Sequence, residues 1–186
     1  NPCHRLGYLF QKQMVRNVKY KFVIKGNTFG NSFLVVYADD FIAGFQYKED
    51  AEIYYTLLKE RLRKFNLELE ESKSRLIEFG RYAETNSKRK YGKKPETFDF
   101  LGFTFYCGKG KRSRNFCVKL KTNRKKFQQK LKATKEWLYE NRTMPVKEMI
   151  SKLNLKLIGH YKYYGVSHNS AKIGAFLHFI QRYLYK

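Results

Sequence analysis

The sequence predicts an α+β fold in which a mixed α/β part is followed by an all-helical part, with the boundary near residue 120. Two short apolar runs rich in strand-forming residues, 33–37 and 41–45, flank a polar break and predict a β-hairpin. Apolar residues recur at helical spacing through 48–66. Three further amphipathic segments follow residue 121 and predict a small helical bundle.

The remaining segments before residue 120 are shorter and less regular. Residues 67–79 alternate loosely and predict one or two short strands, whereas the polar and basic stretch 80–97 predicts a surface loop. Residues 98–107 and 116–120 predict a second hairpin across the turn 108–111. Residues 1–25 mix aromatic, aliphatic and basic side chains, and their pattern favours no element.

Each helix of the second part has a start signal. Thr122 or Asn123 can cap the first helix, Pro145 suits the first turn of the second, and Asn169 or Ser170 can cap the third. Their apolar positions fall on one face, which is typical of helices that pack against one another. The first helix presents Phe127, Leu131, Thr134 and Leu138 on that face.

Positive charge is the dominant feature of the composition. The 186 residues carry a net charge of +23, and residues 108–186 hold twenty basic residues against three acidic ones. Such an imbalance attracts polyanions, and basic residues interleaved with aromatic ones favour nucleic acid over a membrane surface. A merely solvated basic face is the alternative. The candidate RNA contacts are Lys119, Lys121, Arg124, Lys125, Lys126, Lys130, Lys132 and Lys162.

Two adjacent carboxylates, Asp39 and Asp40, occupy the break in the first predicted hairpin. Like charges this close disfavour each other's ionisation, and a divalent cation relieves that cost. Mg²⁺ prefers oxygen ligands of this kind together with substrate phosphates. The alternative is structural, because Asp is also common in turns, where its side chain accepts hydrogen bonds from nearby backbone amides.

Four segments, taken in order, resemble the reverse transcriptases encoded by group II introns. Tyr37-Ala38-Asp39-Asp40 is similar to the metal-binding hairpin motif of the polymerase palm. Residues 67–80 resemble the next palm motif, and residues 98–105 resemble the primer-grip hairpin. Residues 159–166, Gly-His-Tyr-Lys-Tyr-Tyr-Gly-Val, resemble the thumb, or maturase-specific, segment.

The resemblance implies RNA-directed DNA synthesis from deoxynucleotides on an RNA template and DNA primer, coupled to splicing of the group II intron RNA. It implies a partial palm in residues 1–120, made of two hairpins and a helix, and a three-helix thumb in residues 121–186. Asp39 and Asp40 would bind two Mg²⁺ ions, and Lys73 would protonate the leaving pyrophosphate. Phe100, Leu101, Gly102 and Phe103 would form the primer grip, although three of these side chains also fit a hairpin core.

The sequence departs from the family pattern at its start. No carboxylate precedes Asp39, so the third metal-binding Asp of the family has no counterpart here, and neither has its Pro-Gln-Gly motif. We therefore expect this chain to be incomplete and inactive alone: it is either a truncated gene product or it completes its site with a separately encoded N-terminal half. The alternative function is a non-catalytic intron RNA-binding or splicing cofactor. We expect a cytoplasmic location and no membrane partner, since the longest apolar run is 33–38.

Overall fold

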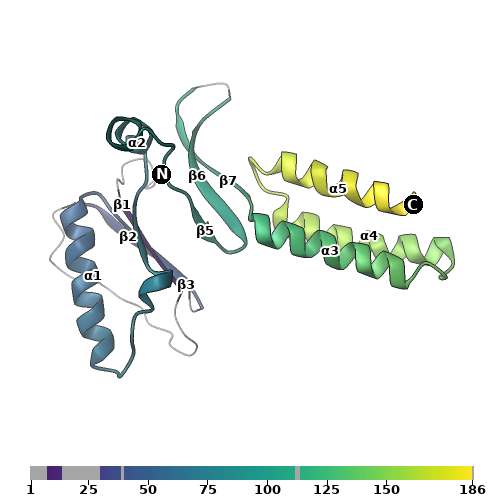
Figure 1. Ribbon diagram of the computed structural model, residues 1–186, viewed down its shortest axis with the longest axis horizontal. Coiled ribbons are helices and arrows are strands. Elements are labelled where there is room, and N and C mark those ends of the chain that lie inside the picture. Colours follow the sequence, from purple (N-terminus) through teal and green to yellow (C-terminus); the bar gives the residue numbers. More distant parts are fainter. Residues whose placement is uncertain (1–7, 14–29, 39, 112–113, 186) are drawn as a thin grey trace. The chain divides into compact units, whose positions relative to one another are not determined.

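A computed structural model describes residues 8–13, 30–38, 40–111 and 114–185; for residues 8–13 and Lys73 it describes the backbone only. Figure 1 shows the arrangement of the elements along the chain. In this part of the chain, strands form a four-stranded and a three-stranded sheet, and α-helices make up most of residues 124–184. The predicted α+β class is confirmed.

The four-stranded sheet has the order β2-β3-β1-β4. Strands β2 (Ser32–Tyr37) and β3 (Asp40–Phe45) form the predicted hairpin, with Tyr37 opposite Asp40. Strand β1 (Tyr8–Gln13) belongs to the segment 1–25, for which the sequence pattern favoured no element. It lies between β3 and β4 (Arg75–Glu78) and is antiparallel to both. The sheet is therefore completed by a strand far from the hairpin in sequence.

Helix α1 (Lys48–Arg63) confirms the helix predicted over 48–66 and packs on this sheet. Ala51, Tyr54, Leu58 and Leu62 meet the inward residues of β3, including Phe45, and are almost fully buried. Asp50, in the first turn of α1, is 1% exposed, and its carboxylate accepts a hydrogen bond from the Gly30 N–H at 3.1 Å. This bond fixes the chain just before β2.

The segment predicted to be a loop, 80–97, contains helix α2 (Ala83–Tyr91), so that prediction was wrong. The helix has no apolar stripe, because Ala83 is its only buried residue. It ends at Gly92, whose φ of 61° is the left-handed conformation that glycine adopts without steric cost. The Gly92 N–H donates to the Lys88 carbonyl at 3.0 Å and closes the last turn.

The second sheet has the order β5-β6-β7, with β5 at Phe98–Phe100, β6 at Phe103–Lys109 and β7 at Phe116–Thr122. The β6–β7 pair is the predicted hairpin. Residues 98–107, however, are two strands and not one, because Leu101 (φ 50°) and Gly102 (φ 75°) turn the chain between them. The primer-grip candidates therefore lie around the β5–β6 turn.

Three helices follow, as predicted: α3 (Arg124–Glu140), α4 (Val146–Tyr164) and α5 (Ser170–Leu184). The core that they share is almost fully buried from solvent, since Leu153, Phe176 and Ile180 are at most 2% exposed. Asn123 caps α3, and its side chain accepts hydrogen bonds from the N–H groups of Lys125 (2.9 Å) and Lys126 (3.1 Å).

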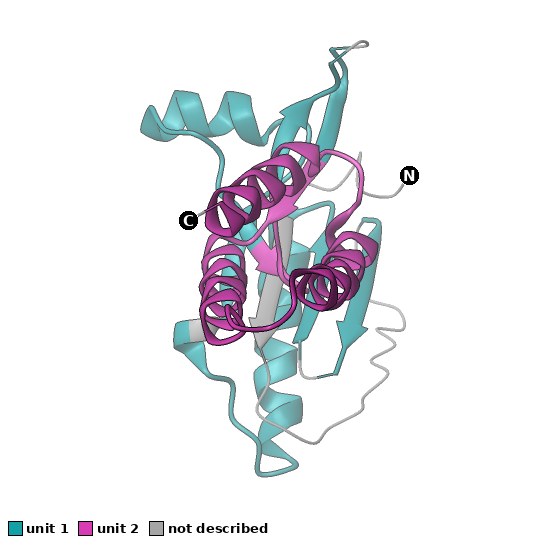
Figure 2. Cartoon of the chain, turned by 90° about the vertical axis from the view of Figure 1, so that its right-hand side faces the viewer, with its two compact units in different colours: residues 1–98, 106–118 teal, residues 99–105, 119–186 magenta. Residues whose placement is uncertain are grey.

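The chain divides into two compact units, shown in Figure 2. Unit 1 comprises residues 1–98 and 106–118, and unit 2 comprises residues 99–105 and 119–186. The β5–β6 turn thus belongs with the helices. A membrane-spanning helix is absent from the described residues, where every helix is too short or too polar to cross a bilayer.

Candidate functional site

The turn that carries the carboxylate pair is tight and strained. Tyr37 and Asp40 face each other in the β2–β3 ladder, so only Ala38 and Asp39 connect the two strands. Ala38 has a φ of 50°, a left-handed conformation that costs a non-glycine residue about 1 kcal/mol. Such strain is found where the surrounding structure holds a functional turn in place. Asp39 itself lies outside the described residues.

Asp40 is the first residue of β3, half-buried, at one end of the sheet. It pairs with Gln13, the last residue of β1. On the other side of β1, Gln11 pairs with Arg75, and only Ser74 separates the short 3-10 turn Glu71–Lys73 from that residue. Asp40 and the Lys73 backbone therefore lie at the same end of the sheet, on either side of the Gln13 end of β1.

The other acidic residues near the hairpin have structural roles. Asp50 lies beyond the Phe45 end of β3, opposite the Asp40 end, and is buried against Gly30. A grouping of three or more His, Cys, Asp or Glu side chains suited to a metal does not occur among the described residues, which do not include Asp39.

The β5–β6 turn is attached to the C-terminal end of α4. The Tyr163 hydroxyl donates to the Leu101 carbonyl at 2.9 Å, and the Asn123 N–H donates to the Gly102 carbonyl at 2.9 Å. The Phe103 ring stacks on Tyr163, with centroids 5.8 Å apart and an interplanar angle of 15°, and meets the edge of Tyr164 at 5.2 Å. Both turn carbonyls are thus engaged within unit 2.

The side chains of this turn divide into buried and partly exposed ones. Phe100 and Phe103 are 7% and 9% exposed, in agreement with the expectation that they form a hairpin core. Leu101 and Gly102 are half-buried. A Cβ added to Gly102 would lie 3.0 Å from the Tyr164 hydroxyl oxygen, which would have to shift slightly, and the φ of 75° strains any side chain at this position.

The tyrosines of the 159–166 segment have different environments. Tyr161 packs against the helical core. Tyr163 is 53% exposed, and Tyr164 is half-buried. The contacts of Tyr163 and Tyr164 with the β5–β6 turn were not predicted from the sequence, because Tyr163 and Leu101 are 62 residues apart in the chain.

His160 is buried without a hydrogen-bond partner at either ring nitrogen within the described residues. It is 4% exposed and stacks on Phe176 with centroids 4.0 Å apart. Desolvation by burial, assisted by the positive charge of Lys130, lowers the pKa of His160 to about 4. The imidazole is therefore a neutral aromatic core residue at pH 7.

The basic candidates are solvent-accessible side chains on β7, α3 and α4, together called the basic surface below. Lys119 is half-buried on β7, and the other candidates, on β7, α3 and α4, are exposed or half-buried. Arg124, Lys125 and Lys126 occupy the first turn of α3, which holds no acidic residue and carries the positive end of the helix dipole. Three cations at that end repel the dipole, and a bound anion would relieve the repulsion.

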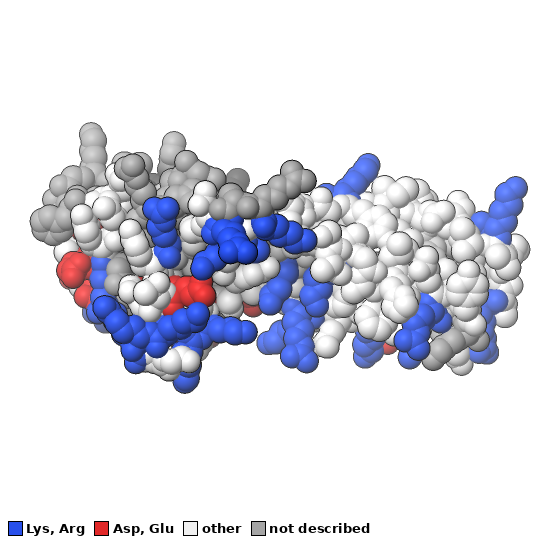
Figure 3. Space-filling view, turned by 90° about the horizontal axis from the view of Figure 1, so that it is seen from above, with Lys and Arg blue, Asp and Glu red and all other residues white. Residues whose placement is uncertain are grey.

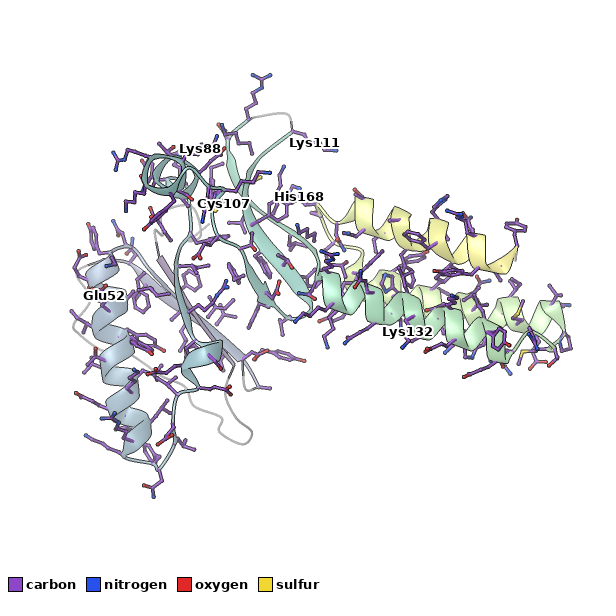
Figure 4. The ribbon with its side chains drawn as sticks, in the orientation of Figure 1. Glu52, Lys88, Cys107, Lys111, Lys132 and His168 are labelled. Carbon is purple, nitrogen blue, oxygen red and sulfur yellow. The ribbon has the colours of Figure 1, made fainter. Side chains whose placement is uncertain are left out.

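Along the rest of α3, Lys132 lies 3.7 Å from Glu136, an exposed pair that contributes little to stability. Figure 4 shows Lys132 projecting from this helix. On the face of the molecule seen in Figure 3, Lys and Arg predominate over Asp and Glu. The basic surface is thus largely uncompensated by nearby acids.

Comparison with protein families accounts for most of the chain. Residues 7–105 match the reverse transcriptase (RNA-dependent DNA polymerase) family, and residues 124–186 match the maturase-specific domain of group II introns. No match emerged among curated proteins. The first family synthesises DNA on RNA and generally uses Mg²⁺, and the two domains together act on intron RNA and other nucleic acid substrates. The chain belongs to the group II intron reverse transcriptases and maturases.

Proposed function

We propose that the end of the four-stranded sheet where Asp40 lies is the polymerase centre of this chain. The observation that supports this proposal most directly is that β1 pairs with both β3 and β4, so that Asp40 and the Lys73 backbone lie at one end of the sheet. Asp39 and Asp40 offer an all-oxygen donor set, which suits Mg²⁺. Two such ions would activate the primer 3′-hydroxyl and stabilise the leaving pyrophosphate oxygen. Lys73 would supply the proton that the pyrophosphate takes up.

In this proposal the β5–β6 turn is the primer grip, formed by Phe100, Leu101, Gly102 and Phe103. The bonds from Tyr163 and Asn123 to the turn carbonyls support it, because they leave little freedom for a segment that must position a primer. Residues 1–120 then act as the C-terminal part of a palm, and residues 121–186 act as the thumb. Substrates are an RNA template, a DNA primer and deoxynucleotides.

The basic surface of β7, α3 and α4 would bind the parent intron RNA through its phosphates. Its support is the cationic first turn of α3 described above. We further propose that a separately encoded N-terminal half supplies the third metal-binding carboxylate and that the complex works in the cytoplasm.

RNA-templated primer extension by the chain, mixed with such an N-terminal half and Mg²⁺, tests the catalytic proposal. Asp39→Ala and Asp40→Ala are each expected to lower extension at least about a thousandfold, given the charge stabilisation that metal ligands supply. Extension that persists in both variants would show that the carboxylates are not the metal site.

The second candidate is a non-catalytic splicing cofactor, favoured by the twenty-to-three excess of basic residues in 108–186. RNA binding would then be unaffected by Asp39→Ala and would weaken in Lys125→Ala/Lys126→Ala/Lys130→Ala. Electrostatic binding also weakens steeply as salt rises. Binding that does not change with salt would exclude both candidates.

A further inference from the structure

A cleft of about 450 Å³ opens in unit 1 beside helix α2, a volume within the range of ligand sites. We call it the α2 cleft. It lies between β4, the last turn of α2 and the segment that follows this helix. The residues that matter for its chemistry are Leu76, Lys90, Tyr91, Lys93, Lys94 and Pro95. None of them belongs to the carboxylate turn, the β5–β6 turn or the basic surface of α3.

The walls of the cleft are held by specific bonds. The Ser87 hydroxyl donates to the Lys93 carbonyl at 3.0 Å, which holds the segment after α2 against the helix. The Arg75 guanidinium donates to the Thr97 carbonyl at 2.8 Å and ties the end of that segment to β4. With the left-handed turn at Gly92, these contacts give Lys93 and Lys94 a defined backbone position.

The charge of the cleft is positive. Four lysines line it against two glutamates, Glu78 and Glu96. Glu78 already accepts a hydrogen bond from Asn86 and lies 3.8 Å from the ammonium group of Lys90. Lys93 and Lys94 are exposed and form no ion pair within the described residues. Lys48 is paired with Glu52 at 2.7 Å, so the cations that the rim offers to an anion are Lys93 and Lys94, beside the single carboxylate of Glu96.

The same cleft exposes apolar surface next to these cations. Tyr91 is 71% exposed and makes no ring contact with another aromatic side chain in the described part of the chain. Leu76 is 37% exposed, and Pro95 is half-buried. Bases of single-stranded nucleic acid stack on such rings, while lysines on the rim neutralise the phosphates. In a duplex the interior base faces are covered by their neighbours, and only the outer face of each terminal base pair is open to such a ring.

We propose that the α2 cleft binds a short stretch of single-stranded nucleic acid, with a base against Tyr91 and Pro95 and a phosphate on Lys93 and Lys94. The contact is separate from the polymerase centre and from the α3 surface. It gives unit 1 a binding site of its own for an unpaired strand.

Tryptophan fluorescence tests the stacking directly, because the chain contains a single Trp, Trp137. In the cleft reporter, Tyr91→Trp/Trp137→Phe, the only indole lies in the cleft. The matched control reporter is Tyr82→Trp/Trp137→Phe, since Tyr82 is 69% exposed at the other end of α2 and does not line the cleft. Fluorescein-labelled oligouridylate, oligothymidylate and a blunt duplex serve as probes.

We expect either single strand to quench the indole emission of the cleft reporter saturably, over a concentration range in which the anisotropy of the labelled strand also reports binding. The emission of the control reporter should stay unchanged. Whichever of oligouridylate and oligothymidylate binds with the higher affinity identifies RNA or DNA as the preferred ligand. Unchanged emission of the cleft reporter while anisotropy reports binding would overturn the proposal and leave RNA binding by α3 intact. Equal quenching by the duplex would overturn it as well.

A charge-matched pair of variants provides a second test that leaves Trp137 in place. Lys93→Ala/Lys94→Ala and Arg81→Ala/Arg89→Ala remove the same charge from nearby positions, but Arg81 and Arg89 are exposed and do not line the cleft. We expect the first pair to weaken oligouridylate binding about tenfold more than the second, because phosphate contacts dominate such affinities. Equal losses would indicate general electrostatic attraction and would contradict a site in the cleft.

Discussion

Thr122 and Asn169 are joined by two hydrogen bonds across 47 residues of sequence. The Thr122 N–H donates to Asn169 Oδ1, and Asn169 Nδ2 donates to Thr122 Oγ1, each at 2.8 Å. Asn169 also donates to the Tyr164 carbonyl, and both joined residues are at most 2% exposed. The end of β7 is thereby fixed to the start of α5 and to the end of α4.

Asn169→Ala should destabilise unit 2 by about 3 kcal/mol, because it leaves a buried N–H and a buried hydroxyl without partners. Urea unfolding followed by Trp137 emission measures this loss, since Trp137 lies in unit 2. Ser170→Ala, at the exposed neighbouring position, is the control and should change the free energy of unfolding by less than about 0.5 kcal/mol. Equal effects would mean that the two bonds are not important for stability.

Two glycines of unit 2 should respond to alanine with opposite sign. Gly102→Ala places a Cβ 3.0 Å from the Tyr164 hydroxyl at a φ of 75° and should destabilise by about 1–2 kcal/mol. Gly174 lies inside α5 with open space around its Cβ position, so Gly174→Ala should stabilise by about 0.5–1 kcal/mol. Thermal unfolding of both variants checks the pair, and a stabilising Gly102→Ala would contradict the strained turn.

Removal of the Tyr163 hydroxyl tests whether the β5–β6 turn positions a primer. Tyr163→Phe keeps the stack on Phe103 and loses the bond to the Leu101 carbonyl, at a cost of about 1 kcal/mol or less for a half-exposed pair. We expect KM for the primer to rise several-fold in the complemented extension assay. Tyr139→Phe, on the exposed face of α3, should leave it unchanged. An unaltered primer KM in Tyr163→Phe would argue against the positioning role.

His160 should make the stability of unit 2 depend on pH. In the unfolded chain it titrates near its ordinary pKa, whereas burial lowers the pKa in the fold to about 4. Below about pH 6.5 the His160 imidazole therefore binds a proton in the unfolded state but stays neutral in the folded state. Stability falls as pH drops from about 6.5 to 4, by at most about 1.4 kcal/mol per pH unit.

Urea unfolding between about pH 4 and 8, followed by Trp137 emission, measures this dependence. His160→Phe keeps an aromatic ring on Phe176 and should flatten the curve, whereas exposed His178→Gln should leave it steep. If His160→Phe retains the wild-type slope, the proton uptake belongs to other groups.

Local sequence patterns predicted the elements that have a strong period of their own. The β2–β3 hairpin and helix α1 follow from apolar runs and 3.6-residue spacing, and so do the three helices of unit 2. Helix α2 was missed because it buries only Ala83 and leaves no apolar stripe. Its support is local, including the Glu84–Lys88 ion pair at 3.2 Å.

The sequence named the residues of the candidate site but carried no signal for the way the fold brings their segments together. Strand β1 has no clear alternation, and its place between β3 and β4 comes from long-range pairing. Neither motif alone could therefore predict that Asp40 and the Lys73 backbone lie at the same end of the sheet. The bonds from Tyr163 to Leu101 and from Asn169 to Thr122 also span large sequence separations, for which local patterns carry no signal.

Incorporation of a single deoxynucleotide on an RNA template tests the central claim most directly. The chain, the proposed N-terminal half, a primer and Mg²⁺ are mixed, with Asp40→Ala compared against Glu52→Ala, which removes an exposed carboxylate from α1. The polymerase assignment predicts incorporation by wild type and Glu52→Ala, and a loss of at least about a thousandfold in Asp40→Ala. Equal incorporation by all three, or none by the complemented wild type, would contradict it.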